Sequence, residues 1–234
     1  MIKLINNEFI KLGKSKLIFI QLIFILIILL LYKLDYLKET IYNYIPFVEI
    51  TISILYSGII SKEIDDGTIR YYLTKPFKRW KIYLSKYITI IISAIIILVT
   101  ILIMFIVLYR DIDFEFIIKY LKYSIPLLLC CSIILFNSVI IKNASICASI
   151  NIFLIIFGIV ISQILFGLNI LIVEYTFLPY LDFSIFNDLL TIKSINLEFN
   201  TCLSLYKGII VDILYTILFY ILGNILFIKK DIKN

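Results

Sequence analysis

Long apolar runs with few charges divide the chain into six segments that are separated by polar stretches. A membrane-spanning helix needs about 20 predominantly apolar residues, within a range of roughly 17–25. The segments closest to this requirement are residues 17–32, 41–61, 87–109, 123–141, 144–173 and 208–228. No small-residue cleavage site follows Tyr32, so we expect the first segment to remain as a span rather than be removed as a signal peptide. The pattern predicts an all-α fold: a polytopic membrane protein with six transmembrane helices in one domain over residues 1–234.

Two further parts of the chain, residues 1–16 and 174–207, keep apolar character outside the spans. In the first, apolar residues recur at helical spacing, namely Ile2, Ile5, Phe9 and Leu12. This spacing predicts an amphipathic helix on the inner membrane surface, although a plain basic flank that sets the topology would also fit. The second part is the longest outer loop, and its apolar residues favour a segment that re-enters the bilayer or packs over the spans.

Lysine and arginine are distributed unevenly between the two sides of the membrane. With the N-terminus inside, the inner segments hold 15 of these residues and the outer loops hold 7. Short cytoplasmic loops carry an excess of Lys and Arg, so we expect both termini in the cytoplasm. Topology then explains most of the formal net charge of +6, and nucleic acid is not expected as a partner.

The composition agrees with a membrane location and excludes several chemistries. Apolar residues make up 62% of the chain and charged residues 16%, with a mean hydropathy of +1.08. Soluble domains have about 45–50% apolar and about 25% charged residues. The chain has no histidine, which excludes Ser-His-Asp triads, Cys-His dyads and His-ligated zinc. The cysteines show no C-x-x-C spacing and are interpreted as packing residues, so we expect no catalytic residue, no metal site and no enzyme activity.

A fragment of a nucleotide-binding motif occurs near the start of the chain. Gly13-Lys14-Ser15 matches the end of a P-loop, but Glu8 stands where the first glycine of that motif is required. No strand-like run precedes the fragment. We therefore expect this chain to bind no nucleotide and no other cofactor.

Two acidic residues stand inside predicted spans. At 1.5 Å per residue, Glu49 lies about 12 Å and Asp212 about 6 Å from the start of its span. Ionisable residues within spans are costly to bury and are by default candidates for a functional role. Glu49 and Asp212 are therefore candidate pathway residues, although the depth of Asp212 also fits an interfacial position.

The loop of residues 62–86, between the second and third spans, is dense in basic and aromatic residues. Gly67 allows a break after the second span, and Thr74 with Pro76 favours the start of a helix. A surface helix with Leu73, Phe77 and Trp80 among basic residues would dock on a partner or lie against lipid headgroups.

This loop resembles the corresponding loop of type-2 ATP-binding-cassette (ABC) permeases. In that family a glutamate near the end of the second span is followed by Gly-Thr, a basic residue, Leu, Pro and Arg, and then by Lys at the third span. The matching residues here are Glu63, Gly67, Thr68, Arg70, Leu73, Pro76, Arg79 and Lys86. The N-terminal Glu8-x-x-Lys11 is similar to the family's surface helix, and Phe227 to Ile232 is similar to its C-terminus. Size and apolar character look most like the small permeases of bacitracin- and lantibiotic-immunity exporters.

The resemblance implies a mechanism and a set of partners. The loop would form a coupling helix seated in a groove of a separate cytoplasmic ATPase, two copies of which bind ATP and magnesium. Six spans would form half of the pathway that exports a peptide antibiotic, a lipid-like or another amphipathic substrate from the bacterial cytoplasmic membrane. A second permease, identical or different, would complete it. The residues implied at the ATPase-coupling interface are Glu63, Gly67, Thr68, Arg70, Leu73, Pro76, Phe77, Arg79 and Trp80.

Other classes of membrane protein compete with this interpretation. The main alternative is a stand-alone immunity or scaffold protein that acts by binding, without an ATPase. A secondary carrier is less favoured, because the two halves show no obvious repeat and no span is broken by paired Gly or Pro. A membrane enzyme fits least, because histidine is absent and no carboxylate cluster is placed for a metal.

Overall fold

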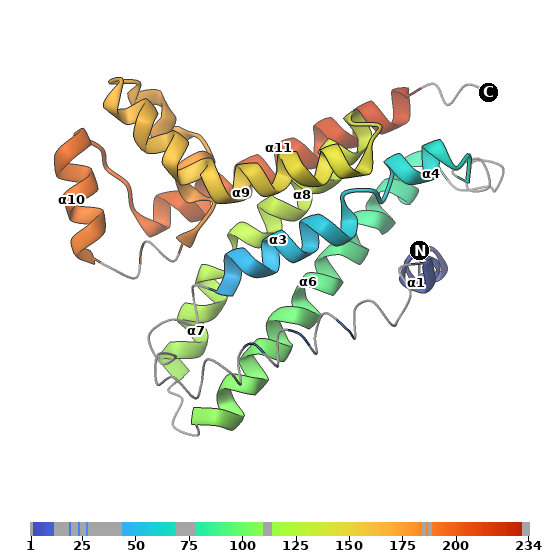
Figure 1. The fold of residues 1–234 in the computed structure, drawn as a ribbon, viewed down its shortest axis with the longest axis horizontal. Coiled ribbons are helices and arrows are strands. Elements are labelled where there is room, and N and C mark those ends of the chain that lie inside the picture. Colours follow the sequence, from blue (N-terminus) through green and yellow to red (C-terminus); the bar gives the residue numbers. More distant parts are fainter. Residues whose placement is uncertain are drawn as a thin grey trace.

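The described part of the chain is helical. The computed structural model describes residues 2–11, 44–68, 78–109, 114–183 and 189–230, together with Phe19, Ile23, Ile27 and Phe186. No strand occurs among these residues, so the all-helical class predicted from the sequence is confirmed for them. The elements are α1 (Ile2–Lys11), α3 (Ile45–Tyr56), α4 (Ser61–Asp65), α6 (Arg79–Tyr109), α7 (Phe114–Tyr123), α8 (Pro126–Ile140), α9 (Ala144–Gly167), the short 3-10 helices η2 (Leu171–Tyr175) and η3 (Leu178–Tyr180), α10 (Leu189–Phe199) and α11 (Leu205–Lys229) (Figure 1).

Within the described residues, five helical stretches are long and apolar enough to cross a membrane. They are Ile45–Ile64, Arg79–Leu108, Phe114–Ile140, Ala144–Gly167 and Leu205–Lys229. In hydrocarbon every backbone polar group must be bonded within the protein, and a helix achieves this even for isoleucine-rich sequences of modest helix propensity. The five stretches correspond to the second to sixth predicted spans. The first predicted span, 17–32, lies outside the described residues apart from Phe19, Ile23 and Ile27.

Several helix ends differ from the apolar runs in the sequence. Helix α6 begins at Arg79 rather than at Tyr87, so Trp80 and Lys86 belong to its first turns. Helix α9 ends at Gly167, well before the predicted limit at residue 173. The chain turns there through Asn169, which adopts a left-handed φ of 59°, a conformation that asparagine tolerates better than most residues.

Short polar residues and prolines set the helix starts. Asn143 caps α9, since its side-chain oxygen accepts a hydrogen bond from the Ser145 amide at 2.9 Å. Ser204 caps α11 in the same way through the Lys207 amide at 3.3 Å, and α11 therefore begins before the predicted limit at residue 208. Pro126 lacks an amide hydrogen, which separates α7 from α8.

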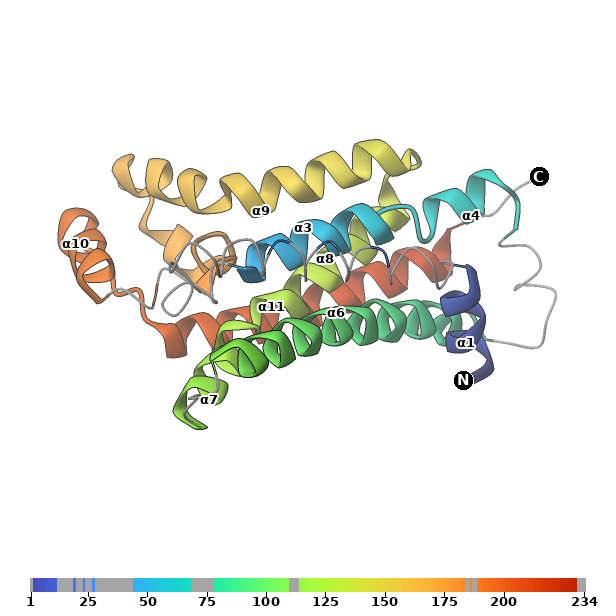
Figure 2. The ribbon, with the colours of Figure 1, turned by 60° about the horizontal axis from the view of Figure 1, so that its bottom comes forward.

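Helix α8 lies in the middle of the bundle and packs against α3, α6, α9 and α11 (Figure 2). It is joined to α9 by a hydrogen bond of 2.6 Å, which Asn137 Nδ2 donates to Asn151 Oδ1. Helices α9 and α11 turn wide apolar faces outward, with side chains such as Phe153 and Leu214 at least half exposed. An outward apolar face is expected of helices that contact lipid.

Helices α6 and α11 approach closely at Gly223. The Tyr83 side chain of α6 is fully buried there, with its ring 5.4 Å from that of Tyr220 and 5.8 Å from that of Phe227. A methyl group at position 223 would overlap with the Tyr83 hydroxyl. Glycine is therefore required for this approach of the two helices.

The two ends of the bundle carry different elements (Figure 1). The first, which we call the α1 end, contains α1, α4, the start of α6 and the finish of α11. The second, the α10 end, contains the starts of α3 and α11 together with η2, η3 and α10. The segment predicted as an outer loop, 174–207, thus contains part of η2, all of η3 and α10.

Candidate functional site

Three charged residues from separate elements meet inside the α1 end. Lys86 of α6 is fully buried, and its Nζ lies 2.7 Å from Glu63 Oε2 in α4 and 3.1 Å from Glu8 Oε2 in α1. The same ammonium donates a hydrogen bond of 3.1 Å to the Ile59 carbonyl. We call Glu8, Glu63 and Lys86 the Lys86 cluster. Because each charge has a partner, the cluster holds α1 and α4 against the first turns of α6.

The local sequence explains how the cluster forms. Along α6, Lys86, Thr89 and Ser93 recur at spacings of three and four residues, so they share the face that points into the bundle. After α4 the chain turns through Gly67, whose φ of +66° lies in the left-handed region that favours glycine. The Thr68 hydroxyl then donates a hydrogen bond of 3.4 Å back to the Glu63 carbonyl. This turn fixes α4 with Glu63 directed at Lys86.

Arg79 joins the start of α6 to the finish of α11. Its guanidinium donates hydrogen bonds of 2.7 Å to the Ile228 carbonyl and 3.2 Å to the Lys230 carbonyl. The last carbonyls of a helix lack partners within the helix, and a cation near them is favourable. The Lys230 ammonium in turn donates to the Val139 carbonyl in the last turn of α8. Three spans are thus fastened together at the α1 end.

The surface of the α1 end carries basic and aromatic side chains. Trp80 is 41% exposed, and Lys81 Nζ lies 5.6 Å from the centre of its ring. Lys78 is also exposed. Of the predicted coupling residues, the other four (Arg70, Leu73, Pro76 and Phe77) lie outside the described residues. The structure therefore places Trp80 in the first turn of α6. This turn follows closely on residues 69–77 of the loop, which lie outside the described part of the chain.

The two acids predicted inside spans are deeply buried near the α10 end. Glu49 of α3 is 1% exposed and Asp212 of α11 is fully buried. In the part of the chain that the structure describes, neither carboxylate has a hydrogen-bond partner. Glu49 lies within electrostatic range of Asp182 and Asp212. Both acids therefore lie inside the protein rather than on its surface.

Tyr180 of η3 lies near Asp212. Its hydroxyl is buried and has no hydrogen-bond partner among the residues that the structure describes. Burial raises the pKa of this phenol, and the charges of Glu174 and Asp212 raise it further, so the hydroxyl keeps its proton. Tyr180 and Phe183 close over Gly208, one turn before Asp212 in α11, where a Cβ would meet them at 2.6 and 3.0 Å.

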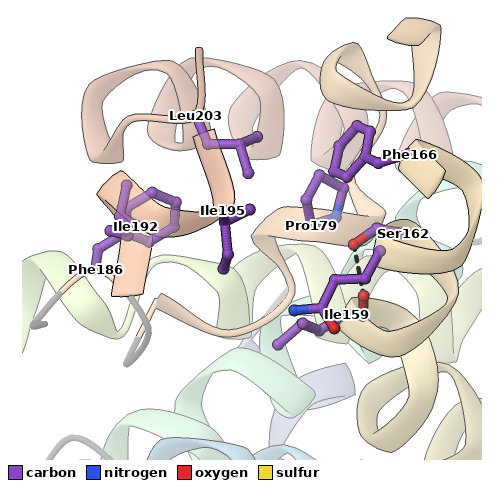
Figure 3. A pocket seen from close by; sticks show the side chains of 9 residues that line it. Ile159, Ser162, Phe166, Pro179, Phe186, Ile192, Ile195 and Leu203 are labelled. Carbon is purple, nitrogen blue, oxygen red and sulfur yellow. Dashed lines mark hydrogen bonds between the residues drawn. The ribbon is translucent and has the colours of Figure 1, made fainter. Parts of the chain in front are cut away.

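A small apolar pocket adjoins this region (Figure 3). It is lined by residues of α9, of the segment around η3, of α10 and of the chain leading into α11, namely Ile159, Ser162, Gln163, Phe166, Pro179, Phe186, Ile192, Ile195 and Leu203. The Ser162 hydroxyl bonds to the Ile159 carbonyl at 2.7 Å, which leaves the pocket wall largely apolar. The ring of Phe186 also stacks on that of Tyr180, with 6.1 Å between ring centres. The pocket and the buried acids therefore share one aromatic wall.

The sequence pattern did not predict that Lys86 and Glu174 are buried. Lys86 belongs to the permease-like pattern and stands at the boundary between the loop and the third predicted span, but the polar residues Lys86, Thr89 and Ser93 mark an inward face of α6. Glu174 pairs with Lys207 and accepts a hydrogen bond of 2.9 Å from the Cys202 amide. No spacing rule predicts that pair, because it depends on how η2 folds against the start of α11.

The described residues contain no group of three or more His, Cys, Asp or Glu placed to hold a metal ion.

Residues 31–233 match the family described as "Protein of unknown function (DUF2705)". The chain belongs to the DUF2705 family. No curated protein matches it. In this DUF2705 chain the family match includes all five described spans, with Glu63 and Lys86, whereas Glu8 and the rest of α1 precede it.

Proposed function

We propose that this chain is the membrane-spanning permease subunit of an ABC transporter. It forms half of a pathway that exports a peptide antibiotic, a lipid-like or another amphipathic substrate. ATP hydrolysis on a separate cytoplasmic ATPase, present in two copies, drives the transport. A second permease subunit, identical or different, completes the pathway in the bacterial cytoplasmic membrane.

The observation that carries this proposal is the meeting of Glu8, Glu63 and Lys86 at the α1 end. Glu63 and Lys86 stand at the two ends of the permease-like loop pattern, and Glu8 belongs to the similar N-terminal helix. The same end holds Arg79 against the finish of α11, which connects the loop pattern with the similar C-terminus. A rigid fastening of α1, α4, α6 and α11 is what a membrane domain needs if a push on one loop is to move its spans together.

The proposal includes an orientation and a sixth span. Residues 17–32 supply the first span, and the α1 end faces the cytoplasm because the inner segments hold 15 Lys and Arg against 7 outside. The exposed Lys78 and Trp80, with the loop before them, then lie where an ATPase can dock. The segment around η3 and α10 lies on the outer side.

Co-purification tests the proposal directly. The tagged chain is expressed with its neighbouring genes, extracted in a mild detergent and examined for an ATPase that remains bound. We expect a protein with ATP-hydrolysing activity in the eluate. Trp80→Ala and Lys78→Glu should reduce its recovery, because both side chains are exposed at the α1 end. Glu63→Ala should alter ATPase coupling through the Lys86 cluster.

Lys193→Glu provides a matched control, since Lys193 is exposed on α10 at the opposite end of the bundle. Its recovery of the ATPase should equal that of the unmodified chain. A chain that purifies alone, and that protects cells from an antibiotic peptide without any ATPase, would contradict the proposal. That outcome would support a stand-alone immunity or scaffold protein.

A further inference from the structure

Two buried acids of the bundle stand out because no cation in the described part of the chain pairs with them. Three other buried acids have lysine partners: Glu8 and Glu63 pair with Lys86, and Glu174 pairs with Lys207. Within the described residues, Glu49 and Asp212 have neither an ion pair nor a hydrogen bond, although both are more deeply buried than Glu174. A charged carboxylate buried in a membrane interior is costly, so each acid is neutralised either by a proton or by a cationic partner. Ionisable residues of this kind within a membrane protein are by default candidates for a ligand site.

One group beside these acids is also short of a partner. The hydroxyl of Tyr180, near Asp212, is fully buried and has no hydrogen bond within the described residues. Three elements, α3, α11 and η3, thus direct unsatisfied oxygen atoms into one region of the α10 end. Buried polar groups in proteins are normally bonded, so this concentration of oxygen atoms is suited to bind a polar ligand.

Aromatic rings complete the surroundings. Tyr180 and Phe183 close over Gly208, next to Asp212, and the Phe183 ring meets that of Phe186 edge-on with 5.6 Å between centres. Aromatic faces attract ammonium groups, and they do so more strongly away from water. Phe186 also lines the apolar pocket of Figure 3. A ligand with its charged head beside the acids and its apolar tail in that pocket would contact protein along its whole length.

We propose that Glu49 and Asp212 bind the ammonium group of an amphipathic amine, with the aromatic wall and the apolar pocket receiving its hydrocarbon part. This inference rests on the proposed export function and specifies its substrate class. Each carboxylate supplies charge, the Tyr180 hydroxyl supplies a hydrogen bond, and Phe186 joins the head site to the tail site.

The test uses the full chain in nanodiscs of neutral phosphatidylcholine, without any ATPase. The probe is n-decylammonium, compared with n-decanol, which has the same tail and no charge. We expect n-decylammonium to raise Tm in a saturable manner and n-decanol not to do so. Glu49→Gln and Asp212→Asn should each weaken the Kd obtained from this shift at least tenfold. Glu198→Gln, at an exposed position of α10, should leave it unchanged. Equal shifts with decanol, or an unchanged Kd in the two variants, would overturn the proposal.

A second measurement needs no substitution. Dicyclohexylcarbodiimide reacts with carboxyl groups in apolar surroundings. The modified residues are then located by mass spectrometry. Decylammonium should protect Glu49 and Asp212 at least tenfold, and labelling that is equal with and without the amine would overturn the proposal. The outcome is separable from the ATPase test: recovery of an ATPase without amine binding would leave the permease and remove only the substrate class.

Discussion

Glu8 and Lys86 are 78 residues apart in the sequence and form a buried ion pair, with 3.1 Å between Oε2 and Nζ. The pair attaches α1 to the first turns of α6, and Glu63 shares the same ammonium. Removing one member of a buried ion group is far more damaging than removing a surface pair, because the remaining charges lose their compensation.

Lys86→Met should therefore destabilise the chain strongly. The variant leaves Glu8 and Glu63 buried near each other without a cation. We expect a loss of about 3–5 kcal/mol, measured by chemical unfolding in detergent micelles. Cleavage of α1 by added protease should also become faster, since the contact that holds this helix is lost.

Lys119→Met is the matched control for that variant. Lys119 and Glu115 form an ion pair of 3.1 Å on α7, but their side chains are 50% and 78% exposed. An exposed pair contributes about 0–1 kcal/mol, so this variant should unfold almost as the unmodified chain does. Equal losses in the two variants would show that Lys86 is not held in a buried cluster.

Gly223→Ala should disrupt the contact between α6 and α11. The new methyl group would overlap with the Tyr83 hydroxyl and approach the Phe136 Cα to 3.4 Å. Overpacking of this kind costs about 1–3 kcal/mol. Tyr83→Phe removes a hydroxyl that has no hydrogen-bond partner and should restore part of the loss in the double variant. Gly167→Ala, where no atom outside the local chain lies nearer than 3.9 Å, should not destabilise. If the loss of stability in the double variant equals the sum of the losses in Gly223→Ala and Tyr83→Phe, the overlap of the two side chains is contradicted.

The hydrogen bond between Asn137 and Asn151 should stabilise the packing of α8 on α9 to a modest degree. Polar contacts between spanning helices average about 0.6 kcal/mol and reach about 1.7 kcal/mol in double-mutant cycles. Asn137→Ala, Asn151→Ala and the double variant form such a cycle around the 2.6 Å bond. The coupling energy, from Tm or denaturant unfolding, should lie in that range, and a value near zero would contradict the contact.

Glu49→Gln and Asp212→Asn should not lower Tm in the absence of ligand. Neither carboxylate has a hydrogen bond or an ion pair to lose within the described residues, and an amide is less costly to bury than a charge. Differential scanning fluorimetry in detergent checks this. A fall of more than about 3 °C, which corresponds to roughly 1 kcal/mol in a chain of this size, would mean that the acids hold the fold together.

The sequence predicted the helical class and located five described spans, because hydrophobic length is a direct requirement of the bilayer. It misplaced the start of α6 because a search for charge-free runs stops at Lys86, and a buried lysine within a helix needs tertiary partners that no local pattern reveals. The loop pattern singled out Glu63 and Arg79, and the structure gives each a specific bond at the α1 end.

The α10 end was harder to read from the sequence. The acids Glu49 and Asp212 were visible as charges within spans, but their common surroundings depend on how η3 folds over Gly208. Long-range contacts such as that of Tyr180 with Phe186 have no local signal. Residue spacing along one helix could not show that α3, α11 and η3 converge.

The bonds from Arg79 to Ile228 and from Lys230 to Val139 have a consequence for biosynthesis. During synthesis α6 and α8 enter the membrane well before α11 leaves the ribosome. Until then Arg79 has no helix end to bind, and the Tyr83 face of α6 has no Gly223 to receive it. The nascent bundle must therefore wait for its final span, and chains that stall before residue 205 should be recognised and degraded by membrane proteases.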